Sequence, residues 1–295
     1  MKLVEQKTNA VGFGYGALVG VVHLLPLPGS PHPSPGLAAV LDRACADAET
    51  LVRGGFRFCI VENFGDAPFG KVVEPHVTAM MAVVTAELGR RFGGPGGLNI
   101  GVNVLRNDPL SALGVAASTG AGFVRINIHA GATWTDQGLI EGRARDTLVY
   151  RRRLWRDLYG PRDEQHANGG VDAGLVRVVA DVDVKHGSSA SGRDLEELTA
   201  DVVGRGGADV VVVSGHATGH QTDLDDIRRI RGAVAKVPVW VGSGATCATI
   251  ANLAKEADGV IIGTDLHQDG QIGKPLDLER AKGVVQEWNA VVAKL

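Results

Sequence analysis

Charged residues occur at alternate positions in a segment that otherwise reads as a buried strand. The segment VVADVDVKHGSS, Val178 to Ser189, is rich in valine but carries Asp181, Asp183 and Lys185. Side chains of a strand point alternately to its two faces, so these three groups share one face, and Val178, Ala180, Val182 and Val184 occupy the other. Two acids and an amine on one face could supply a general base, an oxyanion stabiliser or a Schiff-base amine.

Four other strand-like segments place polar side chains on a corresponding face. They are His23 in GVVHL, Glu62 in CIVEN, Asn103 in IGVNV, and Arg125, Asn127 and His129 in VRINIH. Burying a lone charge costs several kcal/mol, so such groups must be paired, hydrated or bound to a ligand. The sequence therefore predicts a shared polar interior.

The elements that hold these groups alternate between short β-branched runs and helical patterns. Helices between successive strands imply parallel pairing through right-handed crossovers. The run-ins RGGFRFCIVEN, TGAGFVRIN, RGGADVVVVSG and EADGVIIG repeat one helix-to-strand junction, mostly through glycine. Eight such units predict a (β/α)8 TIM barrel as a single domain over residues 1–295. The expected strands are Leu18–Leu24, Phe58–Asn63, Asn99–Leu105, Phe123–His129, Val176–Lys185, Val210–Ser214, Val237–Val241 and Gly259–Ile262.

A doubly wound open sheet is the alternative, but the GFGYG at Gly12–Gly16 precedes its strand instead of following it, so it is given no cofactor role. In a barrel, active sites lie at the carboxyl ends of the strands. Arg125 and Asp181 lie deeper and are expected to form a structural ion pair. The candidate catalytic residues nearer the mouth are Glu62, Asn103, Asn127, Asp183 and Lys185, with His23 and His129 as candidates that could equally be hydrogen-bonded rim histidines.

Glycine-rich turns follow the last strands, in VSGHATG, VGSGAT and IIGTDLH. Backbone N–H groups in such turns bind anions, and the turns after strands seven and eight form the recurrent phosphate site of barrels. The alternative is that these glycines only form tight turns. The expected phosphate donors are Ser214, Gly215, Gly242, Ser243, Gly244, Gly263 and Thr264.

The connection over residues 130–172, between the fourth and fifth strands, is longer than a barrel connection requires. It opens with the polar, glycine-rich HAGATWTDQGLIEG, a candidate active-site lid. The following RARDTLVYRRRLWRDLYG predicts an outer helix whose apolar face holds Leu148, Trp155 and Tyr159.

Composition limits the class of partner. The 295 residues carry a formal charge of -3, so no bulk attraction to nucleic acid or to an anionic membrane is expected. Cys45, Cys59 and Cys247 form no CxxC pair and are expected to be free thiols in a reducing compartment. No signal peptide or membrane span is indicated, which predicts a cytoplasmic protein. A homo-oligomer is possible; no cofactor is expected, although a divalent metal is possible.

Several motifs together resemble the BtpA/SgcQ family over nearly the whole chain: HLLPLPGSP, VENFGDAPF, GVNVLRND, RINIHAGA with TDQGLIEG, VKHGSS, VSGHATG, VGSGAT and IIGTDLH. The resemblance implies a TIM barrel related to ribulose-phosphate-binding barrels. It links one branch of the family to photosystem I biogenesis, while other members occur without photosynthesis, and it assigns no catalytic roles. Positions matching the motifs are His23, Glu62, Asn63, Asp66, Asn103, Arg125, Asn127, His129, Asp136, Lys185 and Ser214.

The leading hypothesis is an enzyme that isomerises or cleaves a small phosphorylated sugar or nucleotide-like substrate, with Glu62 or Asp183 as general base and Lys185 as oxyanion stabiliser or Schiff-base amine. One alternative is a non-catalytic factor for the biogenesis or stability of a membrane complex. Another is a metal-dependent hydrolase using Glu62, His129 and Asp181 or Asp183, although no HxH or HExxH spacing is present.

Overall fold

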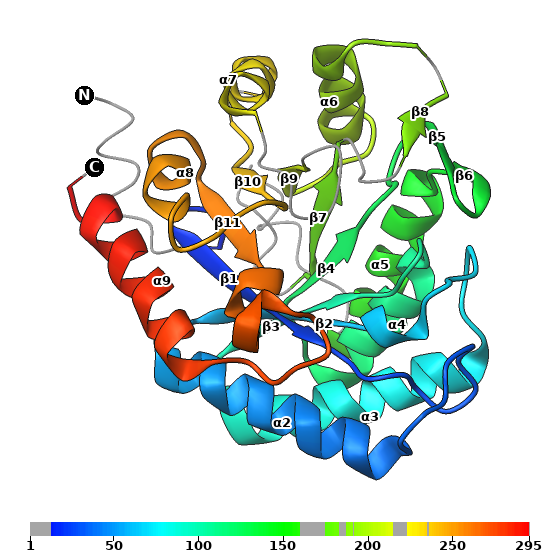
Figure 1. The fold of residues 1–295 in the computed structure, drawn as a ribbon. Helices are drawn as coiled ribbons and strands as arrows, with labels where there is room; N and C mark the ends of the chain where they lie inside the picture. Colours follow the sequence, from blue (N-terminus) through cyan, green and yellow to red (C-terminus); the bar gives the residue numbers. More distant parts are fainter. Residues whose placement is uncertain are drawn as a thin grey trace.

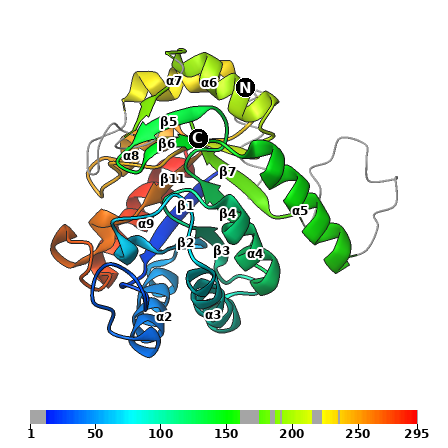
Figure 2. The same ribbon diagram turned by 90° about the vertical axis from the view of Figure 1, so that its right-hand side faces the viewer.

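The computed structural model describes residues 13–159, 175–182, 187–190, 192–214, 223–234 and 236–294. Within them, eight parallel strands close into a barrel, and helices cover its outer surface (Figures 1 and 2). The order around the barrel is β1-β11-β10-β9-β7-β4-β3-β2. The predicted (β/α)8 fold is confirmed.

The barrel strands are β1 (Ala17–His23), β2 (Phe58–Glu62), β3 (Asn99–Asn103), β4 (Phe123–Ile126), β7 (Arg177–Asp181), β9 (Val210–Val213), β10 (Val239–Val241) and β11 (Gly259–Ile262). The helices are α2 (Leu37–Gly54), α3 (Pro75–Phe92), α4 (Pro109–Thr119), α5 (Ala144–Tyr159), α6 (Leu195–Gly204), α7 (Leu224–Ala233), α8 (Ile250–Glu256) and α9 (Leu278–Val292). No helix among the described residues combines the length and the apolarity needed to cross a bilayer.

Alternation along the strands separates two apolar clusters. On β7, Val178 and Ala180 pack with the surrounding helices, whereas Val179 belongs to the cluster inside the barrel. Asp181, two residues further along, has the same parity as Val179 and also points inward, where it meets Arg125. The predicted division into helix-facing and axis-facing positions is confirmed on this strand as far as Asp181.

Aromatic rings close the end of the barrel opposite the carboxyl ends of the strands. Phe13, from the GFGYG segment, has its ring centroid 5.2 Å from that of Phe123 and 5.6 Å from that of Trp240. The indole Nε1 of Trp240 donates to the Gly14 carbonyl at 2.8 Å. The segment before β1 therefore plugs the barrel floor, which leaves the other end for a ligand.

Glycines form the predicted helix-to-strand junctions. Gly55 after α2 and Gly120 after α4 have φ values of 96° and 77°, a left-handed conformation that side chains with a Cβ rarely adopt. The Gly55 N–H bonds the last carbonyls of α2 and so ends the helix. The chain then turns directly into the next strand.

The long connection after β4 begins as a hairpin of β5 (Ala132–Thr135) and β6 (Gly138–Glu141). A third short strand, β8 (Ser188–Ser189), pairs with β5. Ile140 on β6 packs against Ile128, which anchors the hairpin above the end of β4. The predicted Arg-rich helix forms as α5, with Trp155 buried on its inner face.

Candidate active site

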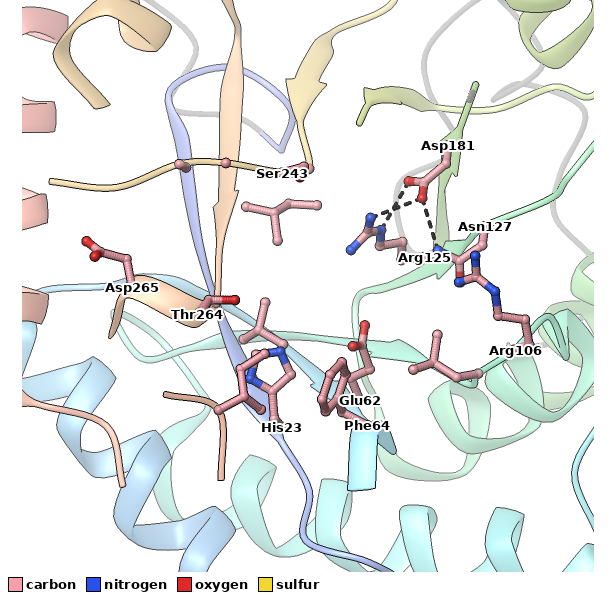
Figure 3. A pocket seen from close by; sticks show the side chains of 18 of the residues that line it. His23, Glu62, Phe64, Arg106, Arg125, Asn127, Asp181, Ser243, Thr264 and Asp265 are labelled. Atoms are coloured by element: carbon pink, nitrogen blue, oxygen red, sulfur yellow. Dashed lines mark hydrogen bonds and ion pairs between the residues drawn. The ribbon is translucent and has the colours of Figure 1, made fainter. Parts of the chain in front are cut away.

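A cavity of about 510 Å³ opens at the carboxyl ends of the strands. Figure 3 shows three groups of side chains around it: His23, Glu62 and Phe64 on one side, Arg125, Asn127 and Asp181 on another, and Ser243, Thr264 and Asp265 on a third. These residues come from β1, β2, β4 and β7, from the positions just after β2 and β4, and from the turns after β10 and β11. The polar interior predicted from strand parity is thus a single chamber.

The ion pair predicted between Arg125 and Asp181 lies on one side of this chamber. Arg125 Nε donates to Asp181 Oδ1 at 3.1 Å and Arg125 Nη2 donates to Oδ2 at 3.0 Å. The Asn127 amide adds a third bond to Oδ2 at 3.0 Å. All three side chains are more than nine-tenths buried. The two-point geometry and the extra donor offset the cost of removing both charges from water.

Asn127 keeps one polar atom without a partner. Its Nδ2 is used by Asp181, but its buried Oδ1 accepts no hydrogen bond, although Asn127 lines the cavity. A buried amide oxygen without a donor costs roughly 1–3 kcal/mol. A ligand hydroxyl or N–H group bound in the cavity could satisfy it.

Glu62 and Asn103 face each other across the neighbouring strands β2 and β3. The Asn103 Nδ2 donates to Glu62 Oε2 at 2.7 Å, and the two residues are directly paired in the strand register. Glu62 lines the cavity and Asn103 stands behind it. Asn103 therefore orients the Glu62 carboxylate, which is the group that meets the ligand space.

His23 lies at the end of β1, where its ring meets Phe64 edge-on with centroids 5.0 Å apart. Its Nδ1 lies 2.9 Å from Nε2 of His267, a residue just after β11. A Cβ added at Gly263 would come within 2.7 Å of the His23 Cε1 atom. The glycine after β11 thus lets this turn approach the histidine closely.

The turns after β10 and β11 line the same cavity. At Gly242, a Cβ would lie 2.5 Å from Val212 Cγ1 and 3.0 Å from Arg125 Nη2, so only glycine lets the first turn pass the ion pair. Ser214 is buried with an unpartnered Oγ and lies behind Gly242 instead of lining the cavity. The cavity-lining members of the expected phosphate site are Gly242, Ser243, Gly244, Gly263 and Thr264.

Several motif residues hold loops in place. Asn63 Nδ2 donates to Asp66 Oδ2 at 3.1 Å, and Asn63 Oδ1 accepts from the Leu105 N–H at 2.8 Å. Asp66 also accepts from the Leu27 N–H at 2.8 Å, and burial raises the pKa of its carboxyl. This network ties together the loops after β1, β2 and β3, so it shapes the cavity wall from behind.

His129 does not reach the cavity. Its Nε2 donates to the Gly206 carbonyl, at 2.8 Å, beside the end of α6. Alternation on this strand ends early because the Asn107 amide makes two 2.9 Å bonds with the backbone of Ile128, in place of a neighbouring strand. The expectation that His129 shares the inward face with Arg125 and Asn127 is therefore corrected.

Asp183, Lys185 and Gly215 lie outside the described residues, so their expected roles stay predictions. Other cavity residues were not singled out from the sequence, although most stand inside motifs quoted above. Arg106 follows β3 in GVNVLRND, and Asp265 follows β11 in IIGTDLH. The residues added by the structure include Phe64, Phe69, Arg106, Ala245, Thr246, Asp265 and Ile272, and they stand beside Asp136, which is one of the motif positions. Asp136, at the hairpin turn, brings the expected lid segment to the cavity mouth.

Within the parts of the chain that the structure describes, no three His, Cys, Asp or Glu side chains gather as they would to hold a metal ion. Each described residue that was considered for a metal-dependent hydrolase is hydrogen-bonded to a different protein group. Glu62 bonds Asn103, Asp181 bonds Arg125, and His129 bonds Gly206.

Comparison with known proteins agrees with this architecture. A sequence profile of the BtpA family matches residues 15–290. An uncharacterized protein of Pyrococcus abyssi is 38% identical over 273 residues, 92% of this chain and 96% of that protein. The photosystem I biogenesis protein BtpA of Synechocystis is 38% identical over 273 residues, 92% of this chain and 88% of that protein. Among solved structures, N-(5'-phosphoribosyl)anthranilate isomerase from Pyrococcus furiosus has a TM-score of 0.50 at 12% identity and covers 93% of this chain and 100% of its own. The last likeness concerns the fold alone, whereas the sequence matches extend over nearly the whole chain. The chain belongs to the BtpA family.

Proposed function

We propose that this barrel is an enzyme acting on a small phosphorylated sugar or nucleotide-like substrate. The observation that carries the proposal is that the glycine turns after β10 and β11 open into the same cavity as Glu62, His23 and Asn127. An anion held at those turns would place the remainder of its molecule among acid, imidazole and amide groups.

The turns supply the anion end of the proposed site. Gly242, Ser243 and Gly244 follow β10, Gly263 and Thr264 follow β11, and the Arg106 guanidinium adds a positive charge to the lining. Arg125 lines the cavity too, but its charge is paired with Asp181. Guanidinium groups and backbone N–H groups are the usual protein partners of phosphate. This combination favours a phosphorylated ligand over a neutral one.

The opposite walls supply hydrogen-bond acceptors. The buried Asn127 Oδ1 has no donor, and the Glu62 carboxylate, which accepts from Asn103, lines the cavity with further acceptor sites. The hydroxyl groups of a sugar can donate to both. An apolar ligand would leave the Asn127 Oδ1 unsatisfied. The neighbour from Pyrococcus furiosus carries phosphoribosyl in its name, which agrees with a ligand of this chemical class.

The proposed chemistry is isomerisation or cleavage beside a carbonyl or glycosidic carbon. Glu62 lies on the cavity wall in a mostly buried environment, where a carboxylate can remove or return a proton. The proposed roles of Asp183 and Lys185, as a second base and an oxyanion stabiliser, would add groups from the segment after β7.

Thermal unfolding with inorganic phosphate and with ribose 5-phosphate tests the proposal. A ligand at 100 times its dissociation constant stabilises the folded state by about 2.7 kcal/mol. We expect both probes to raise the Tm, and ribose 5-phosphate to do so at lower concentration. Gly263→Ala should abolish the effect, because its Cβ would displace the His23 ring. Gly232→Ala, at a position with open space, is the matched control. No shift in the wild type, or equal shifts in both variants, would refute the site.

The Synechocystis relative is by name a photosystem I biogenesis protein, which favours a second candidate, a factor for the biogenesis or stability of that membrane complex. Complementation of a Synechocystis strain lacking this relative separates the two candidates. An enzyme requires Glu62, so Glu62→Gln should fail to complement. A non-catalytic factor would complement equally well with that variant and would fail with substitutions on the outer surface.

A further inference from the structure

The histidine pair at the edge of the cavity has a defined direction of hydrogen bonding. His23 Nδ1 and His267 Nε2 lie 2.9 Å apart, and the two rings are 5.1 Å apart and inclined by 30°. His23 lines the cavity, whereas His267 is completely buried behind it. One nitrogen of this contact must donate and the other accept, and the partner on the far side of His267 decides which.

That partner is a backbone carbonyl. His267 Nδ1 lies 2.6 Å from the Lys274 carbonyl oxygen. A carbonyl oxygen accepts and never donates, so the proton of this bond is on Nδ1 of His267. The Lys274 carbonyl is itself held in place, because Arg43 of α2 donates to it and to the Gly273 carbonyl, the latter at 3.0 Å.

The charge state of His267 completes the assignment. Burial lowers the pKa of its imidazole, against the opposing hydrogen bond to Lys274 and the nearby Asp47 carboxylate, and Arg43 lowers it further. His267 is therefore neutral near pH 7, with its single proton on Nδ1. Its Nε2 then carries a lone pair and can only accept, so Nδ1 of His23 donates.

We propose that His267 is a positioning residue that holds His23 in the Nδ1–H tautomer, so that the lone pair on His23 Nε2 serves as a proton acceptor in the cavity. Free histidine prefers the opposite tautomer, so the partner is needed to maintain this one. The catalytic meaning of the lone pair rests on the proposed function, but the tautomer itself does not.

The surroundings of His23 fix its ring as well as its proton. Phe64 meets the ring edge-on on one side, and Gly263 approaches Cε1 so closely that an alanine there would clash. In Figure 3 the His23 ring stands beside the Glu62 side chain at the same edge of the cavity. A ligand between the anion turns and β2 would thus meet two potential bases, an imidazole and a carboxylate.

A proton balance follows for isomerisation. His23 Nε2 takes a proton from one atom of the ligand and becomes imidazolium, while the electron pair of the broken bond stays on the ligand. The same proton returns to a neighbouring atom, which regenerates the neutral histidine. No further reactant is needed, and His267 stays neutral throughout.

Two-bond ¹⁵N–¹H correlation spectra at pH 7.5 test the assignment, because they distinguish the two neutral tautomers and the imidazolium form of each histidine. In the wild type we expect a protonated Nδ1 and an unprotonated Nε2 for both His23 and His267. In His267→Phe the acceptor is gone, and we expect His23 to change to the Nε2–H form. His32→Phe, at an exposed histidine, is the control.

Several outcomes would overturn the inference. His23 as Nε2–H or as imidazolium in the wild type would do so without any variant. So would a His23 spectrum unchanged by His267→Phe. The His23→Phe variant gives an independent reading, since His267 should keep its Nδ1–H there. Phosphate titration of the same samples separates the two proposals: the expected tautomers without phosphate binding would refute only the proposed function, and phosphate binding with the opposite tautomer would refute only this inference.

Discussion

The buried pair of Arg125 and Asp181 allows a quantitative prediction. Replacing only one partner leaves an uncompensated charge inside the barrel, which costs about 3–5 kcal/mol. Asp181→Leu also removes the acceptor of the Asn127 amide, and an unpaired buried amide adds roughly 1–3 kcal/mol. We therefore expect Asp181→Leu to be more destabilising than Arg125→Met, which leaves Asp181 with the Asn127 bond.

The double variant, Arg125→Met with Asp181→Leu, is expected to be more stable than Asp181→Leu alone. It removes both charges and fills the space with apolar atoms, a change that is often neutral or stabilising for buried pairs. Only the Asn127 amide then remains unsatisfied. The double-mutant cycle should show a coupling free energy of at least about 2 kcal/mol.

Equilibrium urea unfolding, followed by tryptophan fluorescence, to which the buried Trp240 contributes, measures the three variants against the wild type. Single substitutions that each lower the free energy of unfolding by less than about 1 kcal/mol would contradict the reasoning, since a desolvated, unpaired charge destabilises the folded state by more than this. Additive losses in the double variant would contradict it as well, because they would mean that the two side chains act independently.

Three further outcomes are expected. Gly242→Ala should lower stability by about 1–3 kcal/mol, measured as a fall in Tm relative to Gly204→Ala, because its Cβ would lie 2.5 Å from Val212 Cγ1 and nothing lies near Gly204. Burial raises the pKa of Cys59 to about 12, so a thiol reagent at pH 8 should label the exposed Cys247 and leave Cys59 unmodified until the protein unfolds, as mapped by mass spectrometry. Burial lowers the pKa of His129 in the folded protein, so as the pH falls through about 6.5 the unfolded chain takes up this proton first. The free energy of unfolding that is present above this pH is therefore partly lost below it. Urea midpoints measured between pH 7.5 and 5.5 should fall less in His129→Leu than in the wild type.

Strand parity predicted the chamber because it depends only on the ladder. Glu62, Asn103 and Arg125 are paired across β2, β3 and β4 in one register, so their shared direction follows from the period of two. The predicted inward direction of His129 was wrong because the ladder of β4 stops at Ile126, three residues before His129. The cause is the Asn107 side chain, which bonds the Ile128 backbone. Nothing in the local sequence around Ile128 indicates a hydrogen bond from a side chain 21 positions away.

His267 illustrates a second limit of sequence reasoning. It lies 244 positions from His23, in an irregular segment after β11 that has no periodicity to interpret. The tautomer depends on a carbonyl orientation set by Arg43 on α2. Three segments far apart in the chain must fold together before this relation exists, so it can be recognised only in three dimensions.

The buried ion pair of Arg125 and Asp181 distinguishes the two candidate functions by its effect on stability. The lower barrel is filled by Phe123, Val179 and Trp240, which provide an apolar core without the desolvation cost of charges. One layer above, the barrel holds the Arg125 and Asp181 ion pair in place of apolar side chains. Apolar residues at these two positions could give the same stability. A factor that acts through its outer surface gains nothing from the pair, whereas a polar ligand needs a floor of fixed charges and amides. If the double apolar variant unfolds at the same urea concentration as the wild type but no longer binds ribose 5-phosphate, stability cannot be the reason for the pair, and the ligand is.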